Sequence, residues 1–356
     1  MRIWVVVAIA VILLLTGCVD GTDSATDAID EDDADALEDA DDDAGNDENG
    51  ESDADGVPDG ELTIHHIDVG QADSTLIVTP EGETILIDTG DWPQDGAAVI
   101  AYLEERGIDR IDHLVATHGH ADHIGGHAAV IEHFETEGDG IGAAYDSGVP
   151  ADSATYENYL DAIDEHDVEL FLVEEGDELP LEDNLKATVL NPPADYDGSD
   201  LHYSSVAIRF EFGDFRYLTT GDAEQDAEQR MVDDWAEKLE ADVYHAGHHG
   251  SSTSSTPAFM DAVTPEIAIV SSAYESQYGH PDEEVLERYD ESGIETYWTG
   301  VHGDITVTTE GSSVDVETGE SFSSDPADLL EEKPGDDTEA ISPAPITGGI
   351  VVPVPG

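Results

Sequence analysis

A run of ligand-type residues at 118–123, with the sequence HGHADH, constrains this chain more than any other feature. It places the imidazoles of His118, His120 and His123 and the carboxylate of Asp122 within six positions, directly after an apolar, strand-like segment. Imidazole and carboxylate groups are suitable ligands for zinc, iron and manganese. Alternate residues of an extended turn point to the same side, so His118 and His120 can bind one metal ion. Asp122 and His123 then remain for a second ion nearby. The alternative is a polar loop that happens to be rich in histidine.

Further imidazoles and carboxylates follow other strand-like segments. Asp88 ends one, Asp222 ends another, and the pair His248 and His249 follows a third. Residues at strand ends are held by a rigid scaffold, which metal coordination requires. Each feature also has a simpler explanation. Asp88 could form a turn, Asp222 could be the N-cap of a helix expected at 223–239, and the histidine pair could be a polar surface.

Several sequence blocks resemble those of the metallo-β-lactamase-fold hydrolases, and more narrowly the hydrolase domain of ComEC-type DNA-uptake proteins. The blocks are IDVGQADS at 67–74, ILIDTG at 85–90, the HxHxDH run, LTTGD at 218–222, GHHGS at 247–251 and YGHP at 278–281. The resemblance covers roughly residues 62–318 and implies an α/β fold, an αββα sandwich of two mixed sheets flanked by helices. Strand-like runs that alternate with helical ones, including a helix expected at 122–133, fit the same architecture.

The resemblance implies a site for two divalent metal ions, with zinc or manganese as the expected metals. His118 and His120 are assigned to the first ion, and Asp222 is expected to bridge both. With Asp122 and His123 assigned to the second ion, the expected remaining ligand is His248, and His249 is the alternative for that position.

The third ligand of the first ion is left open. Many members of the superfamily supply a histidine from a turn at this point in the chain. Here the turn contains His202, one position away from the family pattern, while ComEC-like sequences often have no histidine there. His202 is therefore one of two alternatives, the other being an open coordination position.

The expected chemistry is hydrolysis. Two metal ions about 3.5–4 Å apart would lower the pKa of a bridging water and supply a metal-bound hydroxide as nucleophile. We expect Asp122 to take part in catalysis and Asp88 to orient a ligand histidine such as His118. His280 is expected to donate a hydrogen bond to a phosphoryl oxygen or to protonate the leaving group, with a structural turn histidine as the alternative.

The charge of the chain is extreme. The net charge is −76, with 86 acidic residues against 10 lysines and arginines. Self-repulsion of this size is tolerable where the Debye length falls to about 3 Å, at molar salt. The composition therefore predicts a protein from a halophile, and it argues against a basic nucleic-acid groove of the usual kind.

The two ends differ in composition from the middle. Residues 1–18 have the layout of a lipoprotein-type signal peptide, with Cys18, the only cysteine, as the lipidated residue. An uncleaved anchor helix is the alternative. Residues 19–61 are expected to be an acidic disordered linker, 62–318 the hydrolase domain, and 319–356 a disordered acidic and proline-rich tail. The domain is thus predicted to lie on the extracellular face of the membrane, lipid-anchored or secreted.

The leading functional prediction is an exported metal-dependent phosphodiesterase or nuclease acting on extracellular DNA, with a separate DNA-uptake channel as an expected partner. Small phosphoesters, including phosphocholine-type head groups, are a close alternative. Hydrolysis of lactam, lactone or thioester bonds is a second, and a non-catalytic metal-binding lipoprotein is a third. The sequence does not define the oligomeric state.

Overall fold

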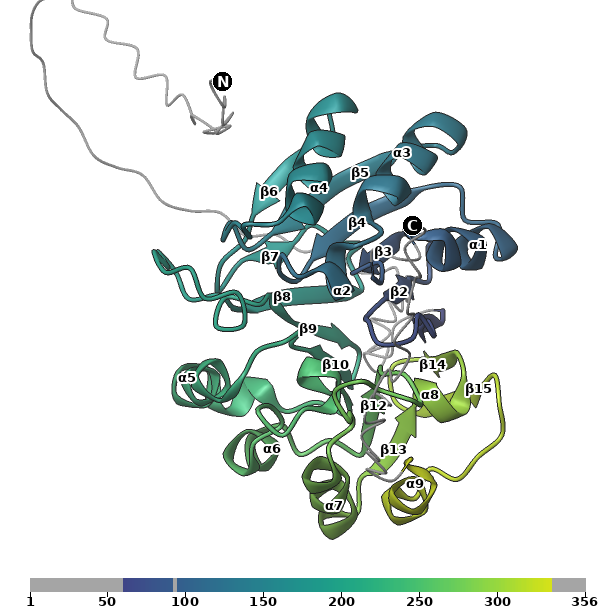
Figure 1. Ribbon diagram of the computed structural model, residues 1–356, viewed down its shortest axis with the longest axis vertical. Coiled ribbons are helices and arrows are strands. Elements are labelled where there is room, and N and C mark those ends of the chain that lie inside the picture. Colours follow the sequence, from purple (N-terminus) through teal and green to yellow (C-terminus); the bar gives the residue numbers. More distant parts are fainter. Residues whose placement is uncertain (1–59, 92–94, 335–356) are drawn as a thin grey trace, which may run out of the picture. The chain divides into compact units, whose positions relative to one another are not determined.

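The computed structural model describes residues 60–91 and 95–334, and within these residues two mixed β-sheets lie against each other (Figure 1). The first sheet has the strand order β15 (Val314–Thr318), β14 (Ile305–Thr309), β1 (Leu62–His66), β2 (Thr75–Val78), β3 (Thr84–Ile87), β4 (Ile111–Ala116), β5 (Ile141–Asp146) and β6 (Leu170–Leu172). The second has the order β13 (Glu295–Trp298), β12 (Ile267–Val270), β11 (Val243–His245), β10 (Phe215–Thr219), β9 (Ala207–Phe212), β8 (Leu185–Asn191) and β7 (Glu178–Leu179).

Strand direction decides where loops can gather. In the first sheet β1, β2 and β3 are antiparallel neighbours, whereas β3, β4, β5 and β6 run parallel. In the second, β7 to β10 are antiparallel and β10 to β13 run parallel. The carboxyl ends of parallel neighbours share one edge of a sheet, so the loops after β3 and β4, and those after β10 and β11, are displayed together.

Alternation along the strands produces three apolar layers. In β10, Phe215 and Tyr217 pack between the sheets, while Leu218 faces the helices of the second sheet. In β3, Ile85 and Ile87 face the second sheet and Leu86 faces the helices of the first. Side chains of a strand alternate between faces, so a strand buried on both sides must be apolar throughout.

Helices cover the outer face of each sheet. The first carries α1 (Ala97–Glu105), α2 (Ala121–Ile124), α3 (His127–Glu137) and α4 (Ala154–Glu165). The second carries α5 (Gln225–Trp235), η1 (Ala236–Leu239), α6 (Pro257–Val263), α7 (Glu283–Ser292) and α9 (Pro326–Glu332). The shorter η2 (Gly247–Gly250) and α8 (Thr299–His302) follow β11 and β13. The predicted αββα sandwich of two mixed sheets flanked by helices is confirmed.

Two expected helices have different bounds. The helix expected at 122–133 is divided into α2 and α3 around Gly125 and Gly126. A Cβ on Gly126 would lie 2.5 Å from the Cα of Gly96 and 2.6 Å from the carbonyl oxygen of Thr89, so close backbone packing accounts for the glycine here. The helix expected from 223 begins at Gln225, and its N-cap is Glu224 rather than Asp222, which frees the Asp222 side chain for another role.

The region after residue 318 also differs from its prediction. A disordered tail was expected from 319, whereas α9 lies at 326–332 and buries Leu329 completely against the helices of the second sheet. The side chain of Asp325 caps α9 by accepting from the amide of Ala327. Within the residues described, no helix has the length and apolar character needed to cross a membrane. The predicted signal peptide, Cys18 and nearly all of the predicted linker lie outside those residues.

Candidate metal centre

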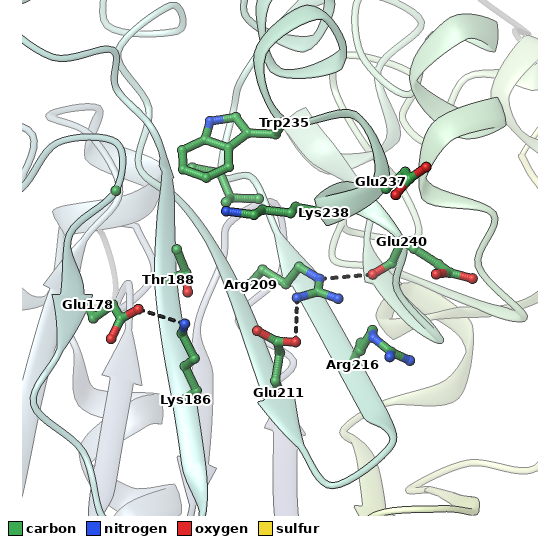
Figure 2. Close-up of a pocket in the computed structure, with 12 residues that line it drawn as sticks. Glu178, Lys186, Thr188, Arg209, Glu211, Arg216, Trp235, Glu237, Lys238 and Glu240 are labelled. Carbon is green, nitrogen blue, oxygen red and sulfur yellow. Dashed lines mark hydrogen bonds and ion pairs between the residues drawn. The ribbon is translucent and has the colours of Figure 1, made fainter.

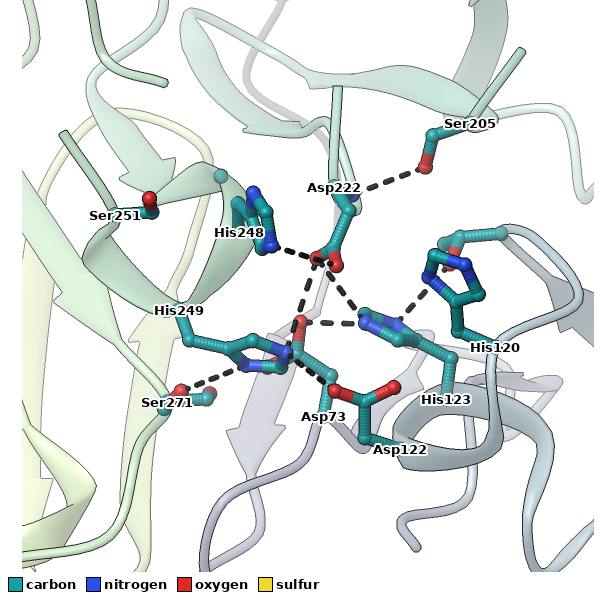
Figure 3. Close-up of polar contacts among 12 residues, drawn as sticks. Asp73, His120, Asp122, His123, Ser205, Asp222, His248, His249, Ser251 and Ser271 are labelled. Atoms are coloured by element: carbon teal, nitrogen blue, oxygen red, sulfur yellow. Dashed lines mark hydrogen bonds and ion pairs between the residues drawn. The ribbon is translucent and has the colours of Figure 1, made fainter. Parts of the chain in front are cut away.

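Imidazoles and carboxylates from several loops meet at the edge of the sheets where β4, β10 and β11 end (Figure 3). Their ligand-type atoms form two adjoining groups with Asp222 common to both. We call the first the inner group; it consists of Asp73, His123, Asp222 and His249. We call the second the outer group; it consists of His118, His120, His202 and Asp222. Within each group the possible ligand atoms lie within 4.8 Å of one another.

All members of the inner group are buried. The Nε2 atom of His123 lies 3.1 Å from Asp222 Oδ1, and Nε2 of His249 lies 3.8 Å from the same oxygen. Asp73 closes the group, with Oδ2 3.9 Å from His123 Nδ1 and Oδ1 3.6 Å from His249 Nδ1. Asp122 flanks it, since its Oδ2 lies 3.4 Å from His249 Nε2.

The inner group contains polar atoms that are buried yet have no hydrogen-bond partner among the described residues. They are Asp73 Oδ1, His123 Nε2, Asp222 Oδ1 and His249 Nε2. Unpaired buried polar atoms are rare because each costs about 1–3 kcal/mol. His123 Nε2 and Asp222 Oδ1 are close but do not meet in hydrogen-bond geometry. A divalent cation would satisfy such a set of nitrogen and oxygen donors, so the residues fit a metal ion.

The charges of the cluster point the same way. Burial by itself raises the pKa of a carboxyl group, but the imidazoles of His123 and His249 outweigh it and hold the pKa of Asp222 well below its usual value. Burial disfavours the charged form of His123, yet the carboxylates of Asp222 and Asp88 outweigh it and raise the pKa of His123 well above its usual value. The buried carboxylates are therefore stable only with positive charge nearby, either as protons on the histidines or as metal ions.

Asp88 supports the inner group from behind. Its Oδ2 accepts a hydrogen bond from His123 Nδ1 at 2.7 Å and from the hydroxyl of Thr117, and its Oδ1 accepts from the backbone amide of Thr117. A proton held on Nδ1 leaves the Nε2 lone pair of His123 directed at the cluster. We expected Asp88 to orient a histidine such as His118, whereas the structure places its carboxylate on His123.

The outer group is more accessible. His118 is buried, but His120 and His202 are partly exposed. His118 Nε2 lies 2.9 Å from His120 Nδ1 and 3.7 Å from Asp222 Oδ2, and the ring of His202 lies 4.9 Å from that of His120. Burial and the neighbouring His123 lower the pKa of His118 well below its usual value, so this imidazole is neutral, as a ligand must be. His202 thus lies among the residues expected to bind the first metal ion.

The histidine pair after β11 is divided between two places by its backbone. His248 and His249 both have left-handed conformations, with φ of 52° and 56°, which non-glycine residues seldom adopt. The turn is fixed by the amide of His248 bonded to the carbonyl of Gly221, and His249 Nδ1 bonds the carbonyl of Ser271. His249 therefore enters the inner group.

His248 faces the rim of the site. Its Nε2 lies 3.6 Å from Asp222 Oδ2, and its Nδ1 lies 3.3 Å from Glu224 Oε1. With His202 and Glu224 it forms a third, more exposed set of ligand-type residues, which we call the rim group. The sequence predicts His248 as the remaining ligand of the second metal ion, with His249 as the alternative. The geometry favours His249 for that position, because His249 and not His248 belongs to the inner group. His202 belongs to both the outer and the rim group.

His280 lies beyond the rim group. Its ring centroid is 5.9 Å from that of His248 and 5.8 Å from that of Tyr278, an exposed side chain. Its Nδ1 atom is buried and has no hydrogen-bond partner within the described residues. Burial lowers the pKa of His280 to about 4. The structure thus places His280 beside the mouth of the site rather than among the candidate ligands.

Two candidate ligands were not singled out by the sequence analysis, Asp73 of the inner group and Glu224 of the rim group. Asp73 belongs to the quoted block at 67–74, in the loop between β1 and β2, and does not come directly after a strand. Two backbone bonds hold it at the cluster, from its amide to the carbonyl of Asp122 and from the amide of Gly90 to its own carbonyl. A search for every carboxylate within the resembling blocks, not only those at strand ends, would have found it.

Residues 67–273 match the model of the metallo-beta-lactamase superfamily, over more than half of the chain. The chain therefore belongs to the metallo-beta-lactamase superfamily, and the prediction of a metal-dependent hydrolase of this superfamily is confirmed. The match spans β2 to β12, the part of the fold that carries both groups of candidate ligands.

The curated relatives confirm the narrower, ComEC-like resemblance. The chain is 31% identical to ComE operon protein 3 of Bacillus subtilis over 255 residues, which is 67% of this chain and 32% of that protein. It is 29% identical to Competence protein ComA of Neisseria gonorrhoeae over 252 residues, 69% of this chain and 32% of that protein. The chain thus spans about a third of the length of these relatives.

Among solved structures, the chain is similar to the metallo-beta-lactamase fold protein YhfI from Bacillus subtilis. The two share 14% sequence identity with a TM-score of 0.40, over 60% of this chain and 86% of YhfI.

Proposed function

We propose that this chain is an exported, membrane-tethered phosphodiesterase that uses two divalent metal ions, zinc or manganese, to hydrolyse extracellular DNA. The observation that carries the proposal is the pair of ligand groups joined by Asp222. A carboxylate shared by two adjacent sets of donors is the arrangement a two-metal hydrolytic site requires.

We assign one metal ion to the inner group and the other to the outer group. Bound there, the ions would lower the pKa of a water molecule and neutralise charge on the phosphoryl oxygens. The chain's own contribution is geometric. Asp88 fixes the tautomer of His123, the carbonyl of Ser271 fixes His249, and the hydroxyl of Ser205 accepts from the amide of Asp222. Donors held in this way need little rearrangement when substrate arrives.

Two residues are assigned to the substrate side. Asp122 is half-exposed, beside His249 Nε2, where its carboxylate can hold the proton of an attacking water. We assign His280, whose ring centroid lies 5.9 Å from that of His248, to contact with a phosphoryl oxygen or the leaving group. Both roles require only that the scissile phosphodiester lies over the two groups.

DNA is proposed as the substrate because of the relatives. Their names, ComE operon protein 3, Competence protein ComA and Recombination protein 2, connect this kind of domain with competence and recombination. A separate channel protein would then carry DNA across the membrane. The strongly acidic composition does not oppose this substrate if the protein works at molar salt, where charge repulsion of DNA is screened.

The location is proposed from the first residues of the sequence. The apolar run before Cys18 has the length of a signal peptide, and lipid on Cys18 would tether the domain to the outer face of the membrane. The acidic residues that follow would act as a spacer. Radiolabelled palmitate incorporated into the wild type but not into Cys18→Ser would support this; equal labelling of both would contradict it.

The activity is tested with the full chain in molar salt containing Mn²⁺ or Zn²⁺. Bis(p-nitrophenyl) phosphate and single-stranded DNA are assayed in parallel for the wild type, for Asp122→Ala and for the control Asp152→Ala, an exposed aspartate outside the cluster. We expect metal-dependent cleavage of both substrates, lost in Asp122→Ala and kept in Asp152→Ala.

Other outcomes have distinct meanings. Cleavage of the small diester alone would indicate a small phosphoester as the substrate. Bound metal without any phosphodiester turnover would contradict the proposal, and it would favour hydrolysis of a lactam, lactone or thioester bond, or a non-catalytic metal-binding role.

A further inference from the structure

A recess lies on the outer face of the second sheet, where β8, β9 and β10 are bordered by the end of α5 and by η1 (Figure 2). Its volume is about 310 Å³, and a ligand the size of a nucleotide needs a pocket of about this size. The alternation of side chains along β9 decides which of its residues point into the recess. In β9, Ile208 and Phe210 point into the layer between the sheets, so Arg209 points outward into the recess.

The recess concentrates the scarce positive charge of the chain. The whole sequence has 10 lysines and arginines against 86 acidic residues. Four of the ten line this one recess: Lys186, Arg209, Arg216 and Lys238. Four glutamates line it too, so its lining has no net formal charge in a chain whose net charge is −76. A solvated halophile surface would be expected to be acidic here.

Two of the four cations are not neutralised by a carboxylate. Lys186 pairs with Glu178 at 2.7 Å, and Arg209 pairs with Glu211 at 2.9 Å. In contrast, within the described part of the chain neither Arg216 nor Lys238 forms an ion pair. Among the described residues the Arg216 guanidinium donates only to the backbone carbonyl of Asp214, and the Lys238 ammonium lies 4.9 Å from the ring centroid of Trp235.

The wall beside Lys238 has a second unsatisfied group. The Nε1 atom of Trp235 is buried and, within residues 60–91 and 95–334, no acceptor is bonded to it. An indole N–H in such a place normally has a partner. The indole ring of Trp235 lines the recess, but its Nε1 atom is buried away from a ligand, so the donors that the recess offers without a carboxylate partner are Arg216 and Lys238.

We propose that this recess binds a phosphate group, and that in the working enzyme the phosphate belongs to a DNA strand that also crosses the metal centre. A phosphate oxygen accepts several charge-assisted hydrogen bonds at once, and arginine matches its geometry. Such short-range bonds are directional, so they remain useful at salt concentrations that screen long-range attraction. The phosphate site stands on the recess itself; its assignment to DNA rests on the proposed function.

A structural connection joins the recess to the metal centre. Leu190 lines the recess, and its neighbour Asn191 donates from Nδ2 to the carbonyls of Tyr203 and Ser205. That segment carries His202 of the outer group. The guanidinium of Arg230 braces the same strand end by donating to the carbonyl of Leu190 and to Asn191 Oδ1. A strand held in the recess would therefore be held by the same framework as the centre.

The test uses the full chain and the double variant Arg216→Gln/Lys238→Gln. The matched control is Arg110→Gln/Lys333→Gln, which removes the same charge from elsewhere. Binding of a fluorescein-labelled oligothymidylate is measured by anisotropy in molar salt with a chelator, so that no cleavage occurs. We expect about tenfold weaker binding for the double variant and little change for the control. Turnover of bis(p-nitrophenyl) phosphate with metal should equal that of the wild type, because neither residue lies in the metal centre.

Competition distinguishes the source of the phosphate. Displacement of the label by inorganic phosphate or thymidine monophosphate at low concentration would assign the recess to free phosphate compounds, whereas displacement only by unlabelled oligonucleotide assigns it to a strand. Equal affinity of the double variant and the control, or no binding by the wild type, would overturn the phosphate site. Weakened binding in a protein that cleaves no phosphodiester would leave the recess intact and contradict only the proposed function.

Discussion

The inner and outer groups share Asp222 but differ in how firmly their other members are held. In the inner group His123 and His249 are buried, and each has its second ring nitrogen bonded, to Asp88 and to the carbonyl of Ser271. In the outer group His120 and His202 are partly exposed, and His202 lies 3.5 Å from Glu224 of the rim group.

The difference suggests that the inner group binds its metal ion tightly and that the outer group brings its ion into contact with the substrate. A preorganised, buried set of donors binds a metal ion tightly, because little entropy is lost when the ion enters. A half-exposed set that shares a histidine with the rim binds more weakly, but it presents its ion to substrate. We therefore expect the two metal ions to differ in affinity, with the inner one tighter.

The largest effect is expected where the two groups meet. Asp222→Ala removes a ligand from both groups, so both ions should be lost. Loss of about 4 kcal/mol of charge stabilisation corresponds to about a thousandfold lower kcat/KM on bis(p-nitrophenyl) phosphate. Metal content by mass spectrometry should fall together with activity, while Asp152→Ala retains both. If Asp222→Ala still bound two metal ions tightly, Asp222 would not be a ligand shared by the inner and outer groups, and the comparison between them would fail.

The next effect separates the two adjacent histidines. His249→Ala should weaken the tighter metal ion about a hundredfold, whereas His248→Ala should weaken either ion less than about tenfold, because it belongs to the rim group. Isothermal titration with Zn²⁺ into each variant measures both steps. If His248→Ala has the larger effect on the tight step, the expectation from sequence, with His248 as a ligand of the second ion, is the correct one.

A smaller effect is expected for residues that hold a candidate ligand in place without belonging to the inner or the outer group. Asp88→Asn keeps the shape of the side chain but removes the charge that holds the proton on His123 Nδ1, so the tight metal ion should bind about tenfold to a hundredfold more weakly. Ser205→Ala is the matched change beside Asp222 and His118, and it should cost only a few-fold. Similar losses in both variants would mean that the inner group is no better supported than the outer one.

Local sequence was sufficient for the layers of the fold and for the position of the site. Strand segments that are apolar throughout predict burial on both faces, and the HxHxDH run after β4 predicts a metal site at a strand end. Strand β5 was not predicted, because its sequence IGAAYD has little strand propensity. Its small residues are needed instead: a Cβ on Gly142 would lie 2.3 Å from the carbonyl oxygen of Asp112.

The ligand set itself depends on information that sequence patterns do not contain. Whether His248 or His249 enters the inner group is decided by two consecutive left-handed residues, which the pattern GHHGS does not reveal. Asp73 reaches the cluster through backbone bonds to the loop after β3 and to α2, which are close only in the folded chain. The assignment of individual ligands therefore stays a prediction for the variants above.

The smallest effect on activity is expected at Glu228 in α5, which forms hydrogen bonds with the segment that follows His249. Its carboxylate accepts from the amides of Ser255 and Thr256. Burial raises the pKa of Glu228 from its usual 4.5 to about 7, and these hydrogen bonds and Arg288 oppose burial only in part. Between these two pH values the folded protein holds more protons at this carboxyl than the unfolded chain does. The free energy of unfolding should therefore fall as the pH rises from 4.5 to 7.

The contribution of Glu228 to this fall is about 2 kcal/mol between pH 5 and pH 7. Denaturant unfolding at several pH values, in molar salt, should show a slope that Glu228→Gln lacks and that the exposed control Glu287→Gln keeps. Turnover per folded molecule should be unchanged in both variants, since Glu228 supports the loop and not the donors themselves. A slope that is the same in Glu228→Gln would assign the pH dependence to other acidic residues. A large loss of turnover would mean that the inner group depends on this loop for its rigidity.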